Sequence, residues 1–269
     1  MITRIEIARH IVARLKADTP RLQAAFRSNN VHACAVDKVL PVDLAMRIFD
    51  AFPDAATMRH RRSIREDKHV AAQMDAYDPL LEEAVFAFQD VDVVDAVSEI
   101  TGIRSLIPDD KLYAGGISVM TKGSFLNPHL DNSHDADRLL YRAINSLFYV
   151  SPDWSTASGG NLEVWDDGPK GQPREFVSAF NRLVLMSTGR ESWHSVNKVV
   201  ADAKRCCVSN YYFASQPTEG VEHFHVTSFR GRPEQPVVDL VLQADAFARN
   251  AVRMILPHGA AATTHIYRR

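Results

Sequence analysis

The sequence predicts a mainly β fold with flanking helices, in which a β-sandwich or jelly-roll core is enclosed by helices from both ends of the chain. Three changes of pattern along the chain indicate this arrangement. Apolar residues recur at helical spacing over the first hundred residues, short strand-like runs begin near residue 110, and helical spacing returns after Pro236. Many short strands separated by turns are typical of sandwiches and jelly rolls.

The first part of the chain, residues 1–110, is expected to be a helical support region. Apolar residues recur at helical spacing over residues 5–15, and Pro41 begins a second helix that continues to Phe52. A third helical stretch carries apolar residues from Leu81 to Val97 and ends near Gly102. These helices carry apolar faces that must pack against the rest of the fold.

A basic stretch, Arg59–His69, separates the second and third of these helices. A charge run of this kind is usually exposed to solvent, so we expect a solvated loop or a helix end there. The alternative interpretation is a patch that binds an anionic substrate.

The β core is expected over residues 111–215, where apolar runs alternate with turn residues such as Asp166-Asp167-Gly168. The expected strands are Leu112–Thr121, Arg142–Val150, Asn161–Trp165, Arg182–Ser187 and Lys204–Phe213. Residues 216–269 form a C-terminal extension with one helix after Pro236, whose apolar residues share a face. The three regions are expected to form a single domain over residues 1–269.

Composition and charge exclude several classes of protein. Hydrophobic residues make up 46% of the 269 residues and charged residues 24%, which is ordinary for a globular chain. A net charge of −2 provides no electrostatic attraction for nucleic acid, and no apolar run is long enough to span a membrane. Charges interrupt the first ten residues, so no signal peptide is expected, and three cysteines cannot form a disulfide framework. We therefore expect a cytoplasmic protein; the sequence does not indicate its oligomeric state.

The segment Asn127–Asn132 carries the most informative chemistry, because it places His129 and Asp131 two residues apart. In a strand these two side chains project to the same side, where an imidazole and a carboxylate can bind one metal. His194 would add a third ligand. Two histidines and one carboxylate form the facial triad of non-haem Fe(II) oxygenases, which leaves positions open for a chelating co-substrate and O2. A surface pair near a turn is the alternative for His129 and Asp131.

Arg205 begins the last expected strand of the core. Alternation places Arg205, Cys207, Ser209 and Tyr211 on one face of this strand and Cys206 on the other. A guanidinium matches the geometry of a carboxylate, and its burial without an anion would be costly. An inward-facing Arg205 therefore predicts an anionic ligand. The two adjacent cysteines are expected to pack rather than react.

Several pieces of sequence follow one another in a set order between residues 112 and 214. They are His129-Leu130-Asp131, Arg142-Ala-Ile-Asn-Ser-Leu-Phe-Tyr149, Gly159-Gly160-Asn161-Leu162, Asn181-Arg182-Leu183 ahead of His194, and Arg205 ahead of Cys-Cys-Val-Ser-Asn-Tyr-Tyr-Phe. Together they resemble the Fe(II)/2-oxoglutarate-dependent dioxygenases, specifically the prolyl 4-hydroxylase-like branch. The resemblance implies a double-stranded β-helix (jelly roll) core between the helical N-terminal region and the C-terminal helix.

The resemblance also implies roles for individual residues. It assigns Fe(II) to His129, Asp131 and His194, and the distal carboxylate of 2-oxoglutarate to Arg205, with Tyr149 as a hydrogen-bond donor to the same carboxylate. Iron would be the cofactor, and 2-oxoglutarate and O2 the co-substrates.

Two neighbours of Tyr149 belong to the same expected pocket. Asn145 and Leu147 share the face of Tyr149 by alternation and should line the oxoglutarate site. The sequence departs from the family in two places: many relatives have Thr at the position of Asn145, and many have a Tyr where this chain has Val119-Met120-Thr121. The second departure leaves the polar contact to the keto-acid end of the co-substrate unassigned.

The presence of Asp131 favours hydroxylation, because halogenating relatives replace this ligand with a small residue. We expect hydroxylation of an unactivated C–H bond of a small polar metabolite, such as an amino acid or a biosynthetic intermediate, with release of succinate and CO2. A prolyl or other side-chain hydroxylase acting on a protein is the alternative. A jelly-roll module that binds a ligand without turnover, and a zinc hydrolase, are more distant alternatives.

Other polar residues have no assigned role. Asn132 and His134 follow the expected ligand Asp131 and could orient it, face the substrate, or belong to a polar loop. His223 and His225 form another same-face pair, which we interpret as structural.

Overall fold

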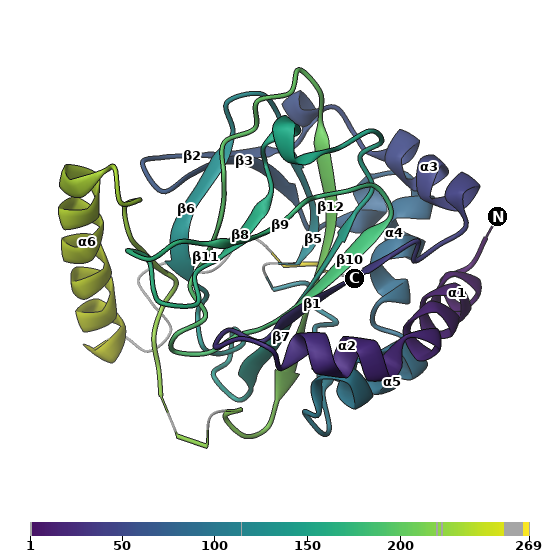
Figure 1. The fold of residues 1–269 in the computed structure, drawn as a ribbon, viewed down its shortest axis with the longest axis horizontal. Helices are drawn as coiled ribbons and strands as arrows, with labels where there is room; N and C mark the ends of the chain where they lie inside the picture. Colours follow the sequence, from purple (N-terminus) through teal and green to yellow (C-terminus); the bar gives the residue numbers. More distant parts are fainter. Residues whose placement is uncertain (1, 114, 219, 222, 256–265, 269) are drawn as a thin grey trace.

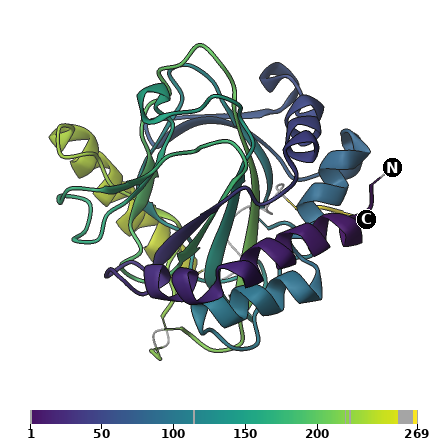
Figure 2. The ribbon, with the colours of Figure 1, turned by 45° about the vertical axis from the view of Figure 1, so that its right-hand side comes forward.

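The computed structural model describes residues 2–113, 115–218, 220–221, 223–255 and 266–268. Within these residues a 13-stranded, antiparallel sheet curls into a nearly closed barrel (Figures 1 and 2). The strands are β1 (Ala33–Asp37), β2 (Arg59–Arg62), β3 (Glu66–Ala71), β4 (Ile107–Pro108), β5 (Gly116–Met120), β6 (Phe125–Leu130), β7 (Tyr141–Tyr149), β8 (Leu162–Val164), β9 (Arg174–Phe176), β10 (Arg182–Ser187), β11 (His194–Val196), β12 (Arg205–Ala214) and β13 (Ser228–Phe229). The expectation of a jelly-roll core with flanking helices is confirmed.

The N-terminal helices cover one outer face of the barrel, as Figure 2 shows. Their apolar faces pack against the outward residues of the central strands and form the largest core cluster. The helices are α1 (Arg4–Ala17), α2 (Thr19–Phe26), α3 (Val42–Ala51), α4 (Pro79–Ala87) and α5 (Val91–Thr101). The third expected helical stretch is therefore two helices. The Asp90 carboxylate accepts a hydrogen bond from the Asp92 backbone N–H and caps the second of them.

Alternation along the central strands separates this packed core from the interior of the barrel. On β12, Cys206 and Val208 point toward the helices, whereas Arg205 and Cys207 point into the barrel. Strand β7 pairs with β12 over its whole length and alternates in the same way. The expected division of β12 into two faces is confirmed, and the inward face belongs to the cavity described below.

The basic stretch Arg59–His69 is not the solvated loop or helix end that its charges suggest. It forms the hairpin of β2 and β3, and β3 lies between β5 and β6 in the sheet and pairs with both. The N-terminal region, expected to be helical, thus supplies β1 and this hairpin to the sheet. Long-range hydrogen bonding to two neighbouring strands stabilises β3, and a local charge pattern does not reveal such partners.

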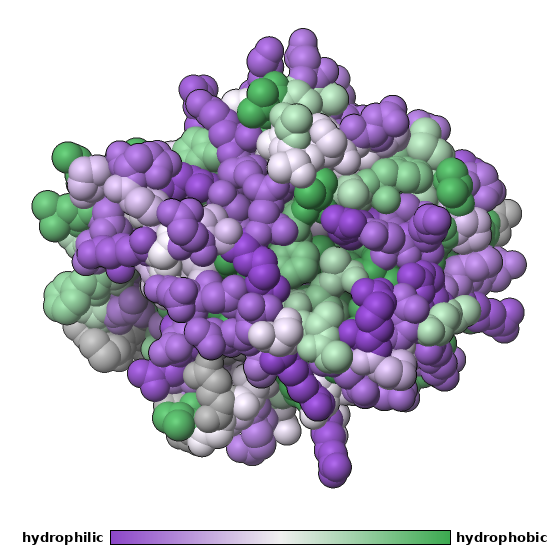
Figure 3. Space-filling view, viewed as in Figure 1, coloured by the Kyte–Doolittle hydropathy of each residue, from purple (hydrophilic) through white to green (hydrophobic). Residues whose placement is uncertain are grey.

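The C-terminal helix α6 (Pro236–Ile255) lies on the opposite side of the barrel from the N-terminal helices (Figure 1). Polar side chains attach it to the body: Asp239 pairs with Arg230, and Asp245 pairs with Arg65. Its apolar residues are largely exposed, among them Leu240 and Phe247. The apolar colour along the left edge of Figure 3, over α6, reflects this arrangement. Among the described residues, no helix combines the length and apolarity needed to cross a membrane.

Candidate metal and co-substrate site

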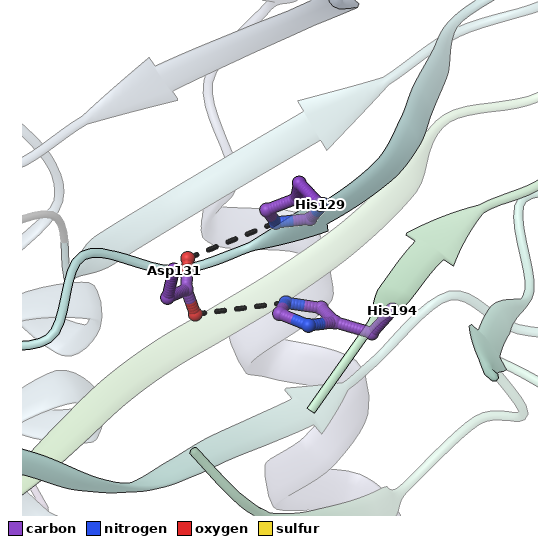
Figure 4. Close-up of side chains that lie close together, drawn as sticks. All are labelled: His129, Asp131 and His194. Atoms are coloured by element: carbon purple, nitrogen blue, oxygen red, sulfur yellow. Dashed lines mark ion pairs between the residues drawn. The ribbon is translucent and has the colours of Figure 1, made fainter. Parts of the chain in front are cut away.

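Two neighbouring strands bring the three expected metal ligands together. Strand β11 pairs with β6 so that His194 lies directly opposite His129, and Asp131 follows two residues further along the chain on the same side. The His129 Nε2 is 3.7 Å from Asp131 Oδ1, and the His194 Nε2 is 3.5 Å from Asp131 Oδ2. Figure 4 shows the three side chains converging on one point. One ligand atom from each residue lies within 4.8 Å of the others, which indicates a site for one metal ion.

Hydrogen bonds prepare both imidazoles for metal binding. The Nδ1 of His129 is 3.0 Å from the Asn127 carbonyl oxygen, and the Nδ1 of His194 is 2.9 Å from the Ser192 carbonyl oxygen. An Nδ1–H that donates to a carbonyl leaves the Nε2 lone pair free to bind metal. Burial lowers the pKa of His129 to about 3 and also lowers the pKa of His194. Both rings are therefore neutral at physiological pH, the state a metal requires.

The third ligand, Asp131, is held by groups that the sequence did not assign to it. The guanidinium of Arg142, whose side chain is 1% exposed, lies 3.4 Å from Asp131 Oδ2. The amide of Asn145 donates to the same oxygen at 2.7 Å, and the ring of Tyr211 lies under the guanidinium, 4.0 Å from it. Burial acts to raise the pKa of Asp131, but the Arg142 guanidinium and the hydrogen bond from Asn145 hold this pKa well below its usual range. The carboxylate is thus ionised and fixed in orientation.

The donor set fits Fe(II). Coordination bonds of about 2.1 Å at right angles place neighbouring donor atoms about 3 Å apart, slightly closer than the separations here. Two imidazoles and one carboxylate on one side of an ion leave the opposite side open, as non-haem iron oxygenases require. Small movements of the side chains would close the ring of ligands around the ion.

Arg205 faces the same cavity as the three ligands and is 3% exposed. Its Nε donates to the Ser178 hydroxyl at 3.0 Å, and its guanidinium lies 4.7 Å from the centre of the Tyr149 ring. Among the residues that the structure describes, no carboxylate lies within 4.0 Å of this guanidinium. A buried cation of this kind needs an anion, so the cavity fits a carboxylate ligand.

The expected residues of β7 line this cavity with Arg205. The hydroxyl of Tyr149 is buried without a hydrogen-bond partner among the described residues, and burial raises its pKa, so it remains a neutral donor. Leu147 provides an apolar wall. Asn145 also faces the cavity; one N–H of its amide donates to Asp131, and its Oδ1 has no hydrogen-bond partner among the described residues.

Among the cavity residues that the sequence analysis did not assign to the site, one is a cation. Lys68, from strand β3, lines the same cavity. Its position in the basic stretch was the available signal, but the charge run was interpreted as a solvated segment.

The two cysteines of β12 are buried and free, and burial raises the pKa of Cys206 to about 12.

Three other histidines, His134, His223 and His225, lie near one another. Asn132, His134 and His225 line a second cavity of about 440 Å³, bounded also by α6. His134 packs against the Tyr141 ring, and its pKa is lowered by burial. His223 and His225 stack on each other with ring centres 5.5 Å apart. None of these three histidines belongs to the cluster of His129, Asp131 and His194.

Comparison with known proteins gives consistent results. Residues 115–213 match the model of the 2OG-Fe(II) oxygenase superfamily. The prolyl 3-hydroxylase OGFOD1 of Xenopus laevis is 32% identical over 117 residues, which are 40% of this chain and 22% of that protein. The chain thus spans about a quarter of the length of the curated relatives it matches.

Two solved structures share the fold. A prolyl-4-hydroxylase from Pseudomonas putida superimposes with a TM-score of 0.53 at 16% identity, covering 76% of this chain and 98% of that one. HygX from Streptomyces hygroscopicus, solved with nickel and 2-oxoglutarate bound, gives a TM-score of 0.50 at 14% identity, covering 74% and 87%. The matched segment, residues 115–213, contains all three expected metal ligands and Arg205, so this part of the chain is similar to the 2OG-Fe(II) oxygenase superfamily.

Proposed function

We propose that this protein is an Fe(II)- and 2-oxoglutarate-dependent dioxygenase that hydroxylates an unactivated C–H bond. One observation carries the proposal: Arg205, a buried arginine that has no carboxylate partner within the described part of the chain, shares a cavity with a His-Asp-His cluster. A metal site alone would fit many activities. A metal site beside a carboxylate-binding arginine fits an enzyme that uses a keto diacid.

Each group of the chain would have a distinct task in this reaction. His129, Asp131 and His194 would hold Fe(II), and Arg205 with the Tyr149 hydroxyl would bind and orient the distal carboxylate of 2-oxoglutarate. When bound, iron would activate O2, the oxidant, and 2-oxoglutarate would supply two electrons as it is converted to succinate and CO2. The ring of Phe229 stacks on His129 with centres 5.0 Å apart and shields the site from water.

The second cavity supports a small polar metabolite as the substrate. It holds about 440 Å³, which is within the range for small-molecule sites, and Asn132 in its wall directly follows the metal ligand Asp131. His134 and Arg249 give this wall polar character. An amino acid or a biosynthetic intermediate fits a space of this size and polarity.

A prolyl or other side-chain hydroxylase acting on a protein is the second candidate. The curated relatives are named as prolyl 3-hydroxylases, and the Pseudomonas putida structure is a prolyl-4-hydroxylase. Shared iron chemistry does not determine the substrate, since the loops and helices outside the core do so.

Three measurements test the reaction. Anaerobic addition of Fe(II) and 2-oxoglutarate should produce a visible charge-transfer band, and O2 should then release succinate. Arg205→Met should lose oxoglutarate binding, whereas Lys204→Met should keep it, because the Lys204 ammonium lies outside the cavity against Phe49. Absence of the band and of succinate release would leave a ligand-binding module. Metabolite pools and prolyl peptides, screened for stimulated succinate release, would distinguish the two substrates.

We also propose a cytoplasmic location. All three cysteines are free and buried, which is typical of proteins folded in a reducing compartment. Cell fractionation with an antibody to the protein tests this proposal.

A further inference from the structure

Two residues in the wall of the second cavity have a buried side-chain nitrogen without a hydrogen-bond partner among the described residues. They are Arg249 on α6, through its Nη2, and His225 on the segment before β13, through its Nε2. The other two guanidinium nitrogens of Arg249 are in use, because Nε donates to Asp245 at 2.9 Å and Nη1 donates to the Thr227 carbonyl at 2.8 Å. Buried polar atoms in folded proteins rarely lack a partner, since this costs free energy. The wall therefore has unused capacity to bind a ligand.

The charges around Arg249 indicate which kind of ligand this wall fits. Asp245 pairs with both Arg249 and Arg65, so one carboxylate offsets only one of two guanidinium charges. Of the described residues that line the cavity, Asp135 alone carries a carboxylate, and its Oδ1 accepts hydrogen bonds from two backbone N–H groups of its own loop. An anionic group in the cavity would balance the remaining positive charge.

The two unpartnered nitrogens belong to neighbouring parts of the wall. Thr227, whose carbonyl binds Arg249, is two residues from His225. The backbone N–H of His225 donates to the Ser133 hydroxyl at 2.9 Å, and the Ser133 N–H donates to the His225 carbonyl at 3.1 Å, so the backbone is fixed at this point. The His225 Nδ1 makes only a long contact of 3.4 Å with the Val226 carbonyl oxygen. The neutral ring can therefore carry its one hydrogen on Nε2 and donate it to a ligand.

The same segment of chain connects this wall to the metal site. It continues into β13, which pairs with β6 so that Phe229 lies opposite the metal ligand His129. Four residues separate His225 from Phe229, and a chain of this length spans at most about 14 Å. Asn132, which follows the metal ligand Asp131, lines the cavity from the other side of this connection. A molecule held in the cavity is thus within reach of the metal site.

We infer that Arg249 and His225 bind an oxyanion, a carboxylate or a phosphate, of the substrate. Calling this anion a part of the substrate rests on the proposed function. The inference narrows the substrate to an acidic metabolite whose reacting C–H bond lies several bonds from its anionic group, because the anion site and the metal site are separate. Phe224 and Val252 give the cavity an apolar part that suits the carbon chain between the two ends.

Anion binding can be measured without iron or oxoglutarate. Phenylglyoxal modifies accessible guanidinium groups, and the Arg249 side chain is 34% exposed, so mass spectrometry can follow its rate of modification. Acetate or inorganic phosphate, compared with chloride at equal ionic strength, should slow this rate about threefold at about twice the Kd of the anion. The more protective of the two identifies the oxyanion. Arg230, which binds Asp239 on α6 but lines neither cavity, should react equally in all three salts. His225→Leu should weaken the protection, and equal rates at Arg249 in all three salts would overturn the inference.

Two variants test whether the anion belongs to the substrate. Compounds that stimulate succinate release are compared in matched pairs, a carboxylate with its amide or a phosphate with its parent alcohol, and the charged member should be preferred. Arg249→Gln should raise the KM of that compound about tenfold or more, as expected for loss of a hydrogen bond between charged groups. The Kd of oxoglutarate should not rise in parallel. Arg230→Gln, which removes another arginine that attaches α6, should change this KM less than about threefold.

The outcomes separate this inference from the proposed function. Equal rises of KM in Arg249→Gln and Arg230→Gln would assign Arg249 only to the attachment of α6 and overturn the inference. A neutral substrate, whether a metabolite or a peptide, that Arg249→Gln converts like the wild type would also overturn it. Absence of the charge-transfer band with Fe(II) and oxoglutarate would instead overturn the proposed function, whatever the salts do at Arg249.

Discussion

The buried ion pair between Arg142 and Asp131 allows a quantitative prediction about stability. The guanidinium is 3.4 Å from the carboxylate, and the two side chains are 1% and 13% exposed. At an effective dielectric constant of about 20, opposite charges at this distance attract by roughly 5 kcal/mol. Arg142→Met keeps an unbranched apolar side chain at this position but leaves the Asp131 carboxylate buried without its cation. Removal of one partner of a buried pair costs about 3–5 kcal/mol, and we expect a loss of that size in the metal-free protein.

Urea unfolding followed by circular dichroism, with chelator present, measures this loss. Arg62→Met is the matched control, because that arginine is 77% exposed and 3.6 Å from Asp67, so its removal should not change the unfolding midpoint measurably. The double variant of Arg142→Met and Asp131→Asn removes both buried charges and should lose less free energy of unfolding than the two single losses added together. Strict additivity, or an Arg142→Met loss no larger than that of the control, would refute the assignment of a coupled buried pair.

Three further predictions concern other parts of the site. Because the folded protein holds the pKa of His129 near 3, the unfolded chain binds more protons than the folded protein below about pH 6.5. The free energy of unfolding of the metal-free protein should therefore fall as the pH falls, by up to about 1.4 kcal/mol per pH unit for each such imidazole. Equal urea midpoints at pH 5 and pH 7 would contradict this prediction. The Cys206 thiol, with its pKa raised to about 12 by burial, should resist alkylation until the protein unfolds, and rapid native labelling by mass spectrometry would argue against its burial. Gly160→Ala places a Cβ 2.8 Å from Val199 Cγ2 and 3.0 Å from Arg205 Cδ, and should weaken oxoglutarate binding about tenfold. Gly168→Ala is the control, because that glycine has a similarly positive φ but lies in open space, and it should not change the affinity. Equal oxoglutarate affinities of the two variants in anaerobic titrations would exclude this effect on Arg205.

The parts of the site predicted from sequence are those that depend on local periodicity. His129 and Asp131 share a face because strand residues alternate. The same alternation grouped Arg205 with Cys207 and Asn145 with Tyr149, and the structure shows that both groups face the cavity. The expected strand at Arg182–Ser187 coincides with β10, and the other expected core strands are found with their ends shifted by one to a few residues. Strand ends shift because turns and neighbouring strands, rather than composition, determine where pairing stops.

The sequence by itself predicted the jelly-roll core, the same-side pair of His129 and Asp131, and the two faces of the strand that carries Arg205, since these depend on residue type and local spacing. The resemblance to a known family added support for His194 and the proposed roles of these residues. Only the tertiary structure decided which distant groups accompany them. Insertion of β3 between β5 and β6 brings Lys68 into the cavity, and the pairing of β6 with β11 sets the two imidazoles opposite each other. The contact of Arg142 with Asp131 and the outward apolar face of α6 also depend on long-range packing. Such contacts follow from which elements meet in three dimensions, and one sequence without its partners in space carries no local signal for them.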